Sequence, residues 1–141
     1  MSTSPSALAR TGRVPAALAA GALLLAGCGG EKAASGEDLK VTGTTNAKGV
    51  GDQQTAAIKM TDDLTFQPNL ITAHVGSLAL TTSNVGSIPH NLVFADSAKG
   101  SLPSVKGHAT ATLRVPLAKA GKYRFTCTFH HGMDGEVVVS G

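Results

Sequence analysis

Four residues in the C-terminal half of the chain carry side chains that bind soft and borderline metal ions. Cys127, His130 and Met133 follow one another at intervals of three positions, and His90 lies well upstream. Together they offer a thiolate, two imidazoles and a thioether. Two histidines and one cysteine in a plane, with a weak axial methionine, form the donor set of a blue-copper electron-transfer centre. Because few other sites use a thioether, the set predicts one type 1 copper ion that cycles between Cu(I) and Cu(II).

Each of these residue types also has an ordinary structural role. A lone histidine is more often hydrogen-bonded in a core, and a lone buried cysteine packs as a small hydrophobe. The joint occurrence and the spacing favour the metal site. We expect His131 to face solvent, with copper loading or partner contact as the alternative, and His74 and His108 to be solvated. Asp62 and Asp63 predict a turn rather than a carboxylate pair for acid–base chemistry.

The elements that must position these residues are β-strands. Apolar and polar residues alternate with period two in four segments after Thr55, namely 71–75, 78–81, 111–116 and 123–127, and residues 137–139 are expected to form a short closing strand. About seven to eight short strands predict an all-β fold made of two packed sheets. Tyr123, Phe125 and Cys127 share one face of their strand, so the thiol should point into the core at the strand's end.

The first 27 residues have the pattern of an export signal. Arg10 and Arg13 precede an apolar run over 14–26, which is too short to span a membrane. The run ends in Leu-Ala-Gly-Cys28, which resembles the lipobox of bacterial lipoproteins. That resemblance implies a signal peptide over 1–27 and a lipidated Cys28. An ordinary signal peptide with an incidental cysteine is the alternative.

Lipidation of Cys28 would leave Cys127 as the one free thiol of an exported chain. A free cysteine in an oxidising compartment is open to oxidation, and metal ligation gives it a reason to persist. A disulfide between Cys28 and Cys127 is the alternative.

Residues 28–53 are rich in Gly, Ala, Ser, Thr and charged residues and predict a flexible linker. The folded domain is then expected over 54–141, anchored outside the cytoplasmic membrane on its extracellular or periplasmic face.

Several motifs around these residues resemble those of the cupredoxin family, and most of all its amicyanin- and plastocyanin-like members. They are Phe-Gln-Pro-Asn-Leu-Ile over 66–71, the strand ending near Asn84, Pro-His-Asn over 89–91, and the segment 123–133. The resemblance covers about 55–141 and implies a Greek-key β-sandwich.

The resemblance also implies roles for individual residues. His90, Cys127, His130 and Met133 would be the copper ligands. Asn91 would tie the two ligand-bearing loops together, with its backbone N–H donating to the cysteine sulfur. The chain departs from amicyanin at 131–132, where His-Gly replaces a proline and a bulky residue, and in a strand after 76 that is one residue longer. The first departure affects the rigidity of the loop and the redox potential, and the second affects the strand register.

These features predict a one-electron carrier rather than an enzyme, with a redox protein as donor and another as acceptor, such as a cytochrome, an oxidase or a dehydrogenase. We expect a monomer that touches the membrane through its lipid. The net charge of +3 is too small to favour nucleic acid, although a patch for an acidic redox partner stays open.

Two other function classes remain. The main alternative is an extracytoplasmic protein that stores or delivers copper without redox turnover, but such proteins favour Met-rich or His-rich tracts and the chain has 3 Met. A copper enzyme needs a second copper site, which the 5 His cannot supply in one chain. Structural zinc sites rarely use methionine.

Overall fold

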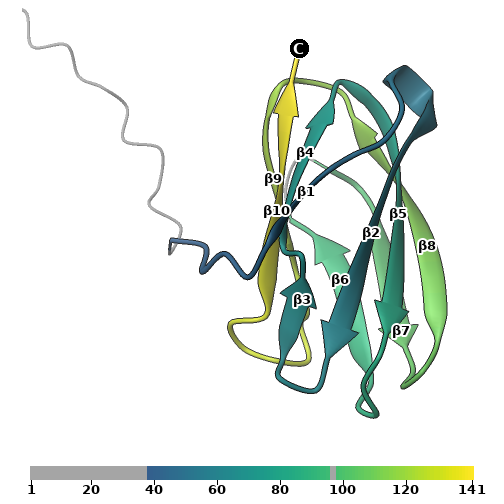
Figure 1. Cartoon of the computed structure of the whole chain (residues 1–141), viewed down its shortest axis with the longest axis vertical. Helices are drawn as coiled ribbons and strands as arrows, with labels where there is room; N and C mark the ends of the chain where they lie inside the picture. The colour runs from purple at the N-terminus through teal and green to yellow at the C-terminus, as the bar shows by residue number, and fades with distance from the viewer. Residues whose placement is uncertain (1–37, 96–97) are drawn as a thin grey trace, which may run out of the picture. The chain divides into compact units, whose positions relative to one another are not determined.

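The computed structural model describes residues 38–95 and 98–141. These residues form ten strands and one short 3₁₀ helix (Figure 1). In chain order the elements are β1 (Thr44–Asn46), η1 (Gly51–Gln53), β2 (Gln54–Thr61), β3 (Thr65–Gln67), β4 (Leu70–His74), β5 (Gly76–Asn84), β6 (His90–Phe94), β7 (Ser101–Val105), β8 (Thr110–Leu117), β9 (Gly121–Thr126) and β10 (Asp134–Ser140). Within this part of the chain, no helix is long and apolar enough to cross a membrane.

The strands form two sheets that pack face to face. One sheet has the order β1-β4-β10-β9-β6-β7 and the other the order β3-β2-β5-β8. Most neighbouring strands are antiparallel, whereas β1–β4, β4–β10 and β2–β5 are parallel. The predicted all-β sandwich is confirmed. The strand count is higher than the predicted seven or eight because β1 and β3 have three residues each and show no alternation that a sequence window could detect.

The core lies between the sheets and follows the predicted alternation. On β9, Tyr123 and Phe125 are buried, whereas Lys122 is exposed. The ring of Phe125 meets that of Phe66 edge-on at 5.1 Å between centroids and that of Phe94 at 5.3 Å. Aromatic pairs in this arrangement stabilise a core beyond the area that they bury. This packing makes the sandwich a rigid support for the residues at its ends.

The predicted linker extends too far towards the C-terminus. Thr44–Asn46 form β1, which pairs in parallel with β4, and Lys48 bridges to Thr55. The segment is held by backbone pairing rather than by apolar side chains, so its composition resembles that of a linker. The domain therefore begins before residue 54. The part of the linker prediction that covers 28–37 lies outside the described residues.

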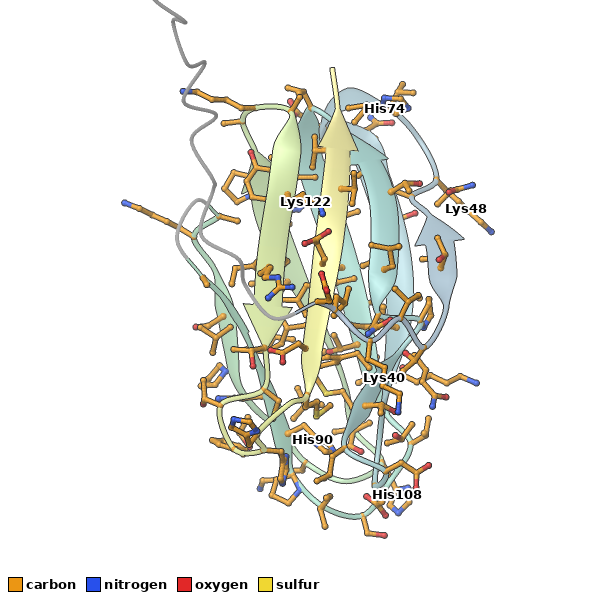
Figure 2. The ribbon with its side chains drawn as sticks, turned by 90° about the vertical axis from the view of Figure 1, so that its left-hand side faces the viewer. Lys40, Lys48, His74, His90, His108 and Lys122 are labelled. Carbon is orange, nitrogen blue, oxygen red and sulfur yellow. The ribbon has the colours of Figure 1, made fainter. Side chains whose placement is uncertain are left out.

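One end of the sandwich collects the connections that matter for the metal-binding residues. The β2–β3 turn, the β5–β6 loop and the β9–β10 loop all lie there, at the lower end of Figure 1. His90 and His108 lie at this end and His74 at the opposite end (Figure 2). The β5–β6 loop leads into His90, and the β9–β10 loop contains the other three predicted ligands.

Candidate metal centre

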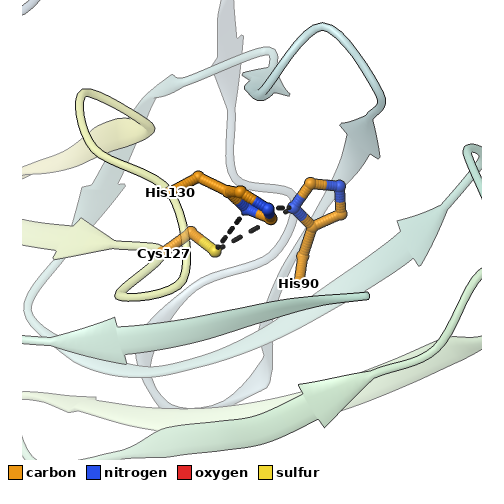
Figure 3. Close-up of side chains that lie close together, drawn as sticks. All are labelled: His90, Cys127 and His130. Atoms are coloured by element: carbon orange, nitrogen blue, oxygen red, sulfur yellow. Dashed lines mark hydrogen bonds between the residues drawn. The ribbon is translucent and has the colours of Figure 1, made fainter. Parts of the chain in front are cut away.

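Three of the predicted ligands converge at this end of the sandwich (Figure 3). The Nδ1 atoms of His90 and His130 are 3.2 Å apart. The sulfur of Cys127 lies 3.4 Å from Nδ1 of His130 and 3.9 Å from Nδ1 of His90. His90 comes from the start of β6 and the other two from the β9–β10 loop, so the site joins segments far apart in the sequence.

The spacing of these donor atoms fits a single metal ion. Zinc–nitrogen and zinc–sulfur bonds of roughly 2.0–2.3 Å show the range for a divalent ion, and two donors on one ion are then separated by roughly 3–4 Å. All three separations here are of that size, and the donor atoms lie within 4.8 Å of one another. A single ion could therefore lie within bonding distance of all three donor atoms.

The alternation along β9 explains the position of the cysteine. Cys127 follows the last residue of β9, keeps the inward phase of Phe125 and is 1% exposed. It is a free thiol. An inward thiol at the end of a strand is enclosed by the core yet lies beside the loop that supplies the next ligand.

The backbone of the β9–β10 loop closes tightly on itself. The N–H of Cys127 donates to the carbonyl of Met133 at 2.9 Å, and the N–H of His130 donates back to the carbonyl of Cys127 at 3.3 Å. Gly132 has φ +77°, a region that favours glycine because it has no Cβ. This glycine is the departure from amicyanin noted in the sequence, and it permits the turn that returns the chain to β10.

Met133 ends the loop and is fully buried. Its carbonyl also accepts a hydrogen bond from Oγ1 of Thr126 at 3.3 Å, and the next residue begins β10. Its backbone is therefore fixed by β9 on one side and by the sheet on the other. Met133 is thereby held in the same loop as Cys127 and His130.

His90 is fully buried at the start of β6. Among the described residues, its Nε2 is a buried nitrogen with no hydrogen-bond partner. Burial lowers the pKa of His90, and the neighbouring His130 lowers it further. The ring is thus a neutral imidazole, which is the form that binds metals, and Nδ1 faces the other donors.

Asn91 joins the two ligand-bearing segments in the way that the resemblance implied. Its backbone N–H lies 3.4 Å from the sulfur of Cys127. Its side chain donates to Oγ1 of Thr128 and accepts the Thr128 N–H, both at 2.7 Å. Sequence reasoning missed Thr128, and the only signal for it was a small polar residue directly after the cysteine.

The remaining histidines lie outside this cluster. His131 is exposed although it follows a cluster residue. His74 is exposed at the other end of the sandwich, where its Nδ1 lies 2.9 Å from Oγ of Ser140, and His108 is exposed. The predicted lipidation site, Cys28, lies outside the described residues.

Comparisons with known proteins bear on the whole domain. A family model for a cupredoxin-like domain matches residues 18–139. Curated proteins gave no match. Several solved structures are similar in fold. One is dithionite-reduced auracyanin from Roseiflexus castenholzii, at 18% identity over 64% of this chain and 100% of that chain, with a TM-score of 0.55.

Two further structures share the fold. An amicyanin variant in its reduced Cu(I) form is 25% identical over 64% of this chain and 86% of that chain, with a TM-score of 0.51. A purple cupredoxin from Nitrosopumilus maritimus is 23% identical over 60% of this chain and 99% of that chain, with a TM-score of 0.50.

Proposed function

The chain belongs to the cupredoxin-like family, and on that basis we propose that it is a type 1 copper protein that carries single electrons between redox proteins. Copper is the metal that suits this family and this donor set. The observation that carries the proposal is the convergence of two Nδ1 atoms and one thiol sulfur at separations of 3.2, 3.4 and 3.9 Å. Two imidazoles, a thiolate and a long thioether contact characterise blue-copper centres.

The protein's contribution is a fixed set of donors. Copper, when bound, would supply a centre that accepts and releases one electron, and His90, Cys127, His130 and Met133 would hold it. His90 and Met133 are fully buried and Cys127 nearly so, and all three are tied to strand ends. Rigid ligands reduce the rearrangement that electron transfer requires, and burial excludes water from the site.

The exit for electrons would be His130. It is the half-buried member of the cluster, whereas His90, Cys127 and Met133 are buried. The ring of its neighbour Phe129 is half exposed, with its centroid 6.4 Å from that of His130. An exposed aromatic ring beside a partly exposed ligand would suit a small, weak interface with a redox partner. Transient electron-transfer complexes form interfaces of this kind.

We also propose that the chain is a lipoprotein held outside the cytoplasmic membrane. The support comes from the sequence: a basic and then apolar N-terminal segment that ends in Leu-Ala-Gly-Cys28. The test is metabolic labelling with a radioactive fatty acid, for which we expect label on the wild-type chain and none on Cys28→Ser. Equal labelling of both would contradict the lipid anchor.

Copper storage or delivery is the competing function. The burial of His90, Cys127 and Met133 favours retention of the ion over its exchange. The test is voltammetry of the copper-loaded chain, for which we expect a reversible one-electron wave and rapid oxidation and reduction by small redox proteins. A copper complex that shows no reversible wave, or that loses its copper on reduction, would contradict the carrier function.

A further inference from the structure

Asp62 lies in the turn after β2, and its carboxylate binds the loop that leads into His90. The N–H of Ser87 donates to both oxygens, at 2.8 and 3.0 Å. The N–H of Ile88 donates to Oδ1 at 3.2 Å. Sequence analysis assigned this residue only to a turn, and neither the donor cluster nor the ligand loop contains it.

The parallel pairing of β2 and β5 brings these segments together. Met60 is the register partner of Asn84, and the N–H of Val85 donates to the carbonyl of Met60 at 2.9 Å. Because the two strands are parallel, both finish at the same end of the sheet, and the residues that follow them lie side by side. Asp62 then stands opposite Gly86, since each lies two positions beyond the paired residues.

The absence of a side chain at Gly86 permits this approach. A Cβ on Gly86 would overlap Oδ1 of Asp62, so a side chain here would displace the loop or the carboxylate. Across the loop, a Cβ on Gly107 would lie 2.5 Å from the carbonyl oxygen of Ser87. The loop backbone thus passes between the carboxylate on one side and Gly107 on the other.

Asn84 holds the peptide groups on either side of those that Asp62 binds. Its Nδ2 donates to the carbonyl of Ile88 at 2.7 Å, and its Oδ1 accepts the N–H of Gly86 at 3.0 Å. Both backbone groups of Ile88 are therefore held by side chains: the N–H by Asp62 and the carbonyl by Asn84. The chain from this residue to His90 is only two positions long, which leaves little freedom for the ring.

The charge of Asp62 also acts on His90, the candidate ligand that follows this loop. The N–H of Ser87, followed by that of Ile88, lowers the pKa of Asp62 below 3.8, so the carboxylate is ionised at neutral pH. The same charge acts on His90, where it opposes the lowering of the pKa by burial. A negative charge near a metal favours the more positive oxidation state, to an extent that solvent reduces.

We propose that Asp62 is a positioning residue of the metal centre: it fixes the backbone over 86–88 so that His90 is placed before copper binds, and its charge favours the oxidised ion. The second half of this proposal rests on the proposed electron-carrier function. The first half concerns the copper-free chain and can be tested without it.

Asp63 supplies a matched control, because it is the adjacent exposed carboxylate and no hydrogen bond from the loop reaches it in the described structure. In the copper-free full-length chain, amide hydrogen exchange at Ser87 and Ile88 is measured by NMR. Asp62→Ala should speed both amides about ten- to hundredfold, since hydrogen bonds to charged groups are among the stronger ones. Asp63→Ala should leave both rates unchanged.

Unchanged exchange in Asp62→Ala, or equal acceleration in Asp63→Ala, would overturn the positioning role. Gly86→Ala provides a second variant should Asp62→Ala fail to fold. This variant keeps the charge of Asp62, but its added Cβ would separate the loop from the carboxylate. Amide exchange at Ser87 and Ile88 should therefore become faster. Unchanged rates in Gly86→Ala would overturn the proposal equally.

The electrostatic half is tested in the copper-loaded chain. Asp62→Asn removes the charge and keeps an acceptor oxygen, so the reduction potential should rise above that of both the wild type and Asp63→Asn. An equal or lower potential would overturn this half. A chain that binds no copper would contradict the proposed function instead, and the exchange data on Ser87 and Ile88 would still decide the positioning role.

Discussion

The backbone N–H of Asn91 points at the sulfur of Cys127 from 3.4 Å, across a separation of 36 positions in the chain. A donor directed at a thiolate reduces the electron density that the sulfur can give to a metal. Such contacts beyond the ligands tune the affinity and the potential of metal sites. In this protein the contact would favour the reduced ion and raise the potential, and it depends on the register between β6 and β9.

The side chain of Asn91 should be important for stability. Asn91→Ala removes both 2.7 Å hydrogen bonds to Thr128 and leaves the Thr128 N–H without its acceptor. We expect a loss of about 1–3 kcal/mol in the free energy of unfolding, measured by urea denaturation of the copper-free chain. Thr128→Ala loses one bond only and should cost less. A loss in Asn91→Ala no larger than that in Thr128→Ala would contradict this account.

The sequence pattern located five of the ten strands that the described residues form. In β4, β5, β8 and β9, more buried and less buried residues alternate over five or more positions, whereas β10 buries Gly135, Glu136 and Val137 in succession. β1 has three residues and no buried side chain, so its pairing with β4 is a backbone effect that composition does not reveal. The linker boundary was misplaced for that reason.

Cys127, His130 and Met133 could be predicted as candidate ligands from type and spacing, because they are local in sequence. The contacts that hold them are not local. Asn91 was anticipated only through the family resemblance. Asp62 was assigned to a turn because its contact with Ser87 depends on the parallel register of β2 and β5. The register between two strands that are distant in the sequence cannot be read from a sequence pattern.

Met133 is expected to act as the weak axial ligand. Met133→Leu keeps the volume and the apolar character of this fully buried side chain, so the domain should fold and keep its colour. The reduction potential should rise, because losing a weak donor to the oxidised ion favours the reduced one. Met60→Leu, at the other described methionine that is fully buried, is the control. A potential in Met133→Leu that is unchanged or lower would argue against axial ligation.

Acid should destabilise the copper-free chain. Burial, followed by His130, lowers the folded-state pKa of His90 below 6.5. The unfolded chain therefore binds a proton in a pH range where the folded chain does not, and stability falls as the pH drops below about 6.5. Asp62 does not contribute there, since its pKa lies below 3.8.

Urea midpoints at pH 7.5 and pH 5 measure this effect. The wild type should have the lower midpoint at pH 5, and His90→Leu should reduce the difference. His108→Ala, at an exposed histidine, should leave the difference intact. A wild-type chain that is as stable at pH 5 as at pH 7.5 would show that His90 is not held neutral by burial.

Asn69 connects the start of the domain to the strand that follows the ligand loop. Its buried side chain donates to the carbonyls of Lys40 and Asp134, at 2.8 and 3.1 Å, and accepts the N–H of Thr42 at 2.7 Å. Asn69→Ala should cost about 2–4 kcal/mol, because several backbone groups lose their partner at once. Asn46→Ala, which removes one exposed bond to Thr72, should change the free energy of unfolding by less than about 0.5 kcal/mol. Similar losses in the two variants would contradict the role of Asn69.

The account depends most on a bond between the sulfur of Cys127 and copper. The direct measurement is the absorption and electron paramagnetic resonance of the copper-loaded chain, compared with Cys127→Ser and with Cys28→Ser as the matched cysteine control. The account predicts an intense visible thiolate-to-copper band and a small copper hyperfine splitting in the wild type and in Cys28→Ser, and neither feature in Cys127→Ser. An intense band that persists in Cys127→Ser, or a copper-loaded wild type without colour, would contradict it.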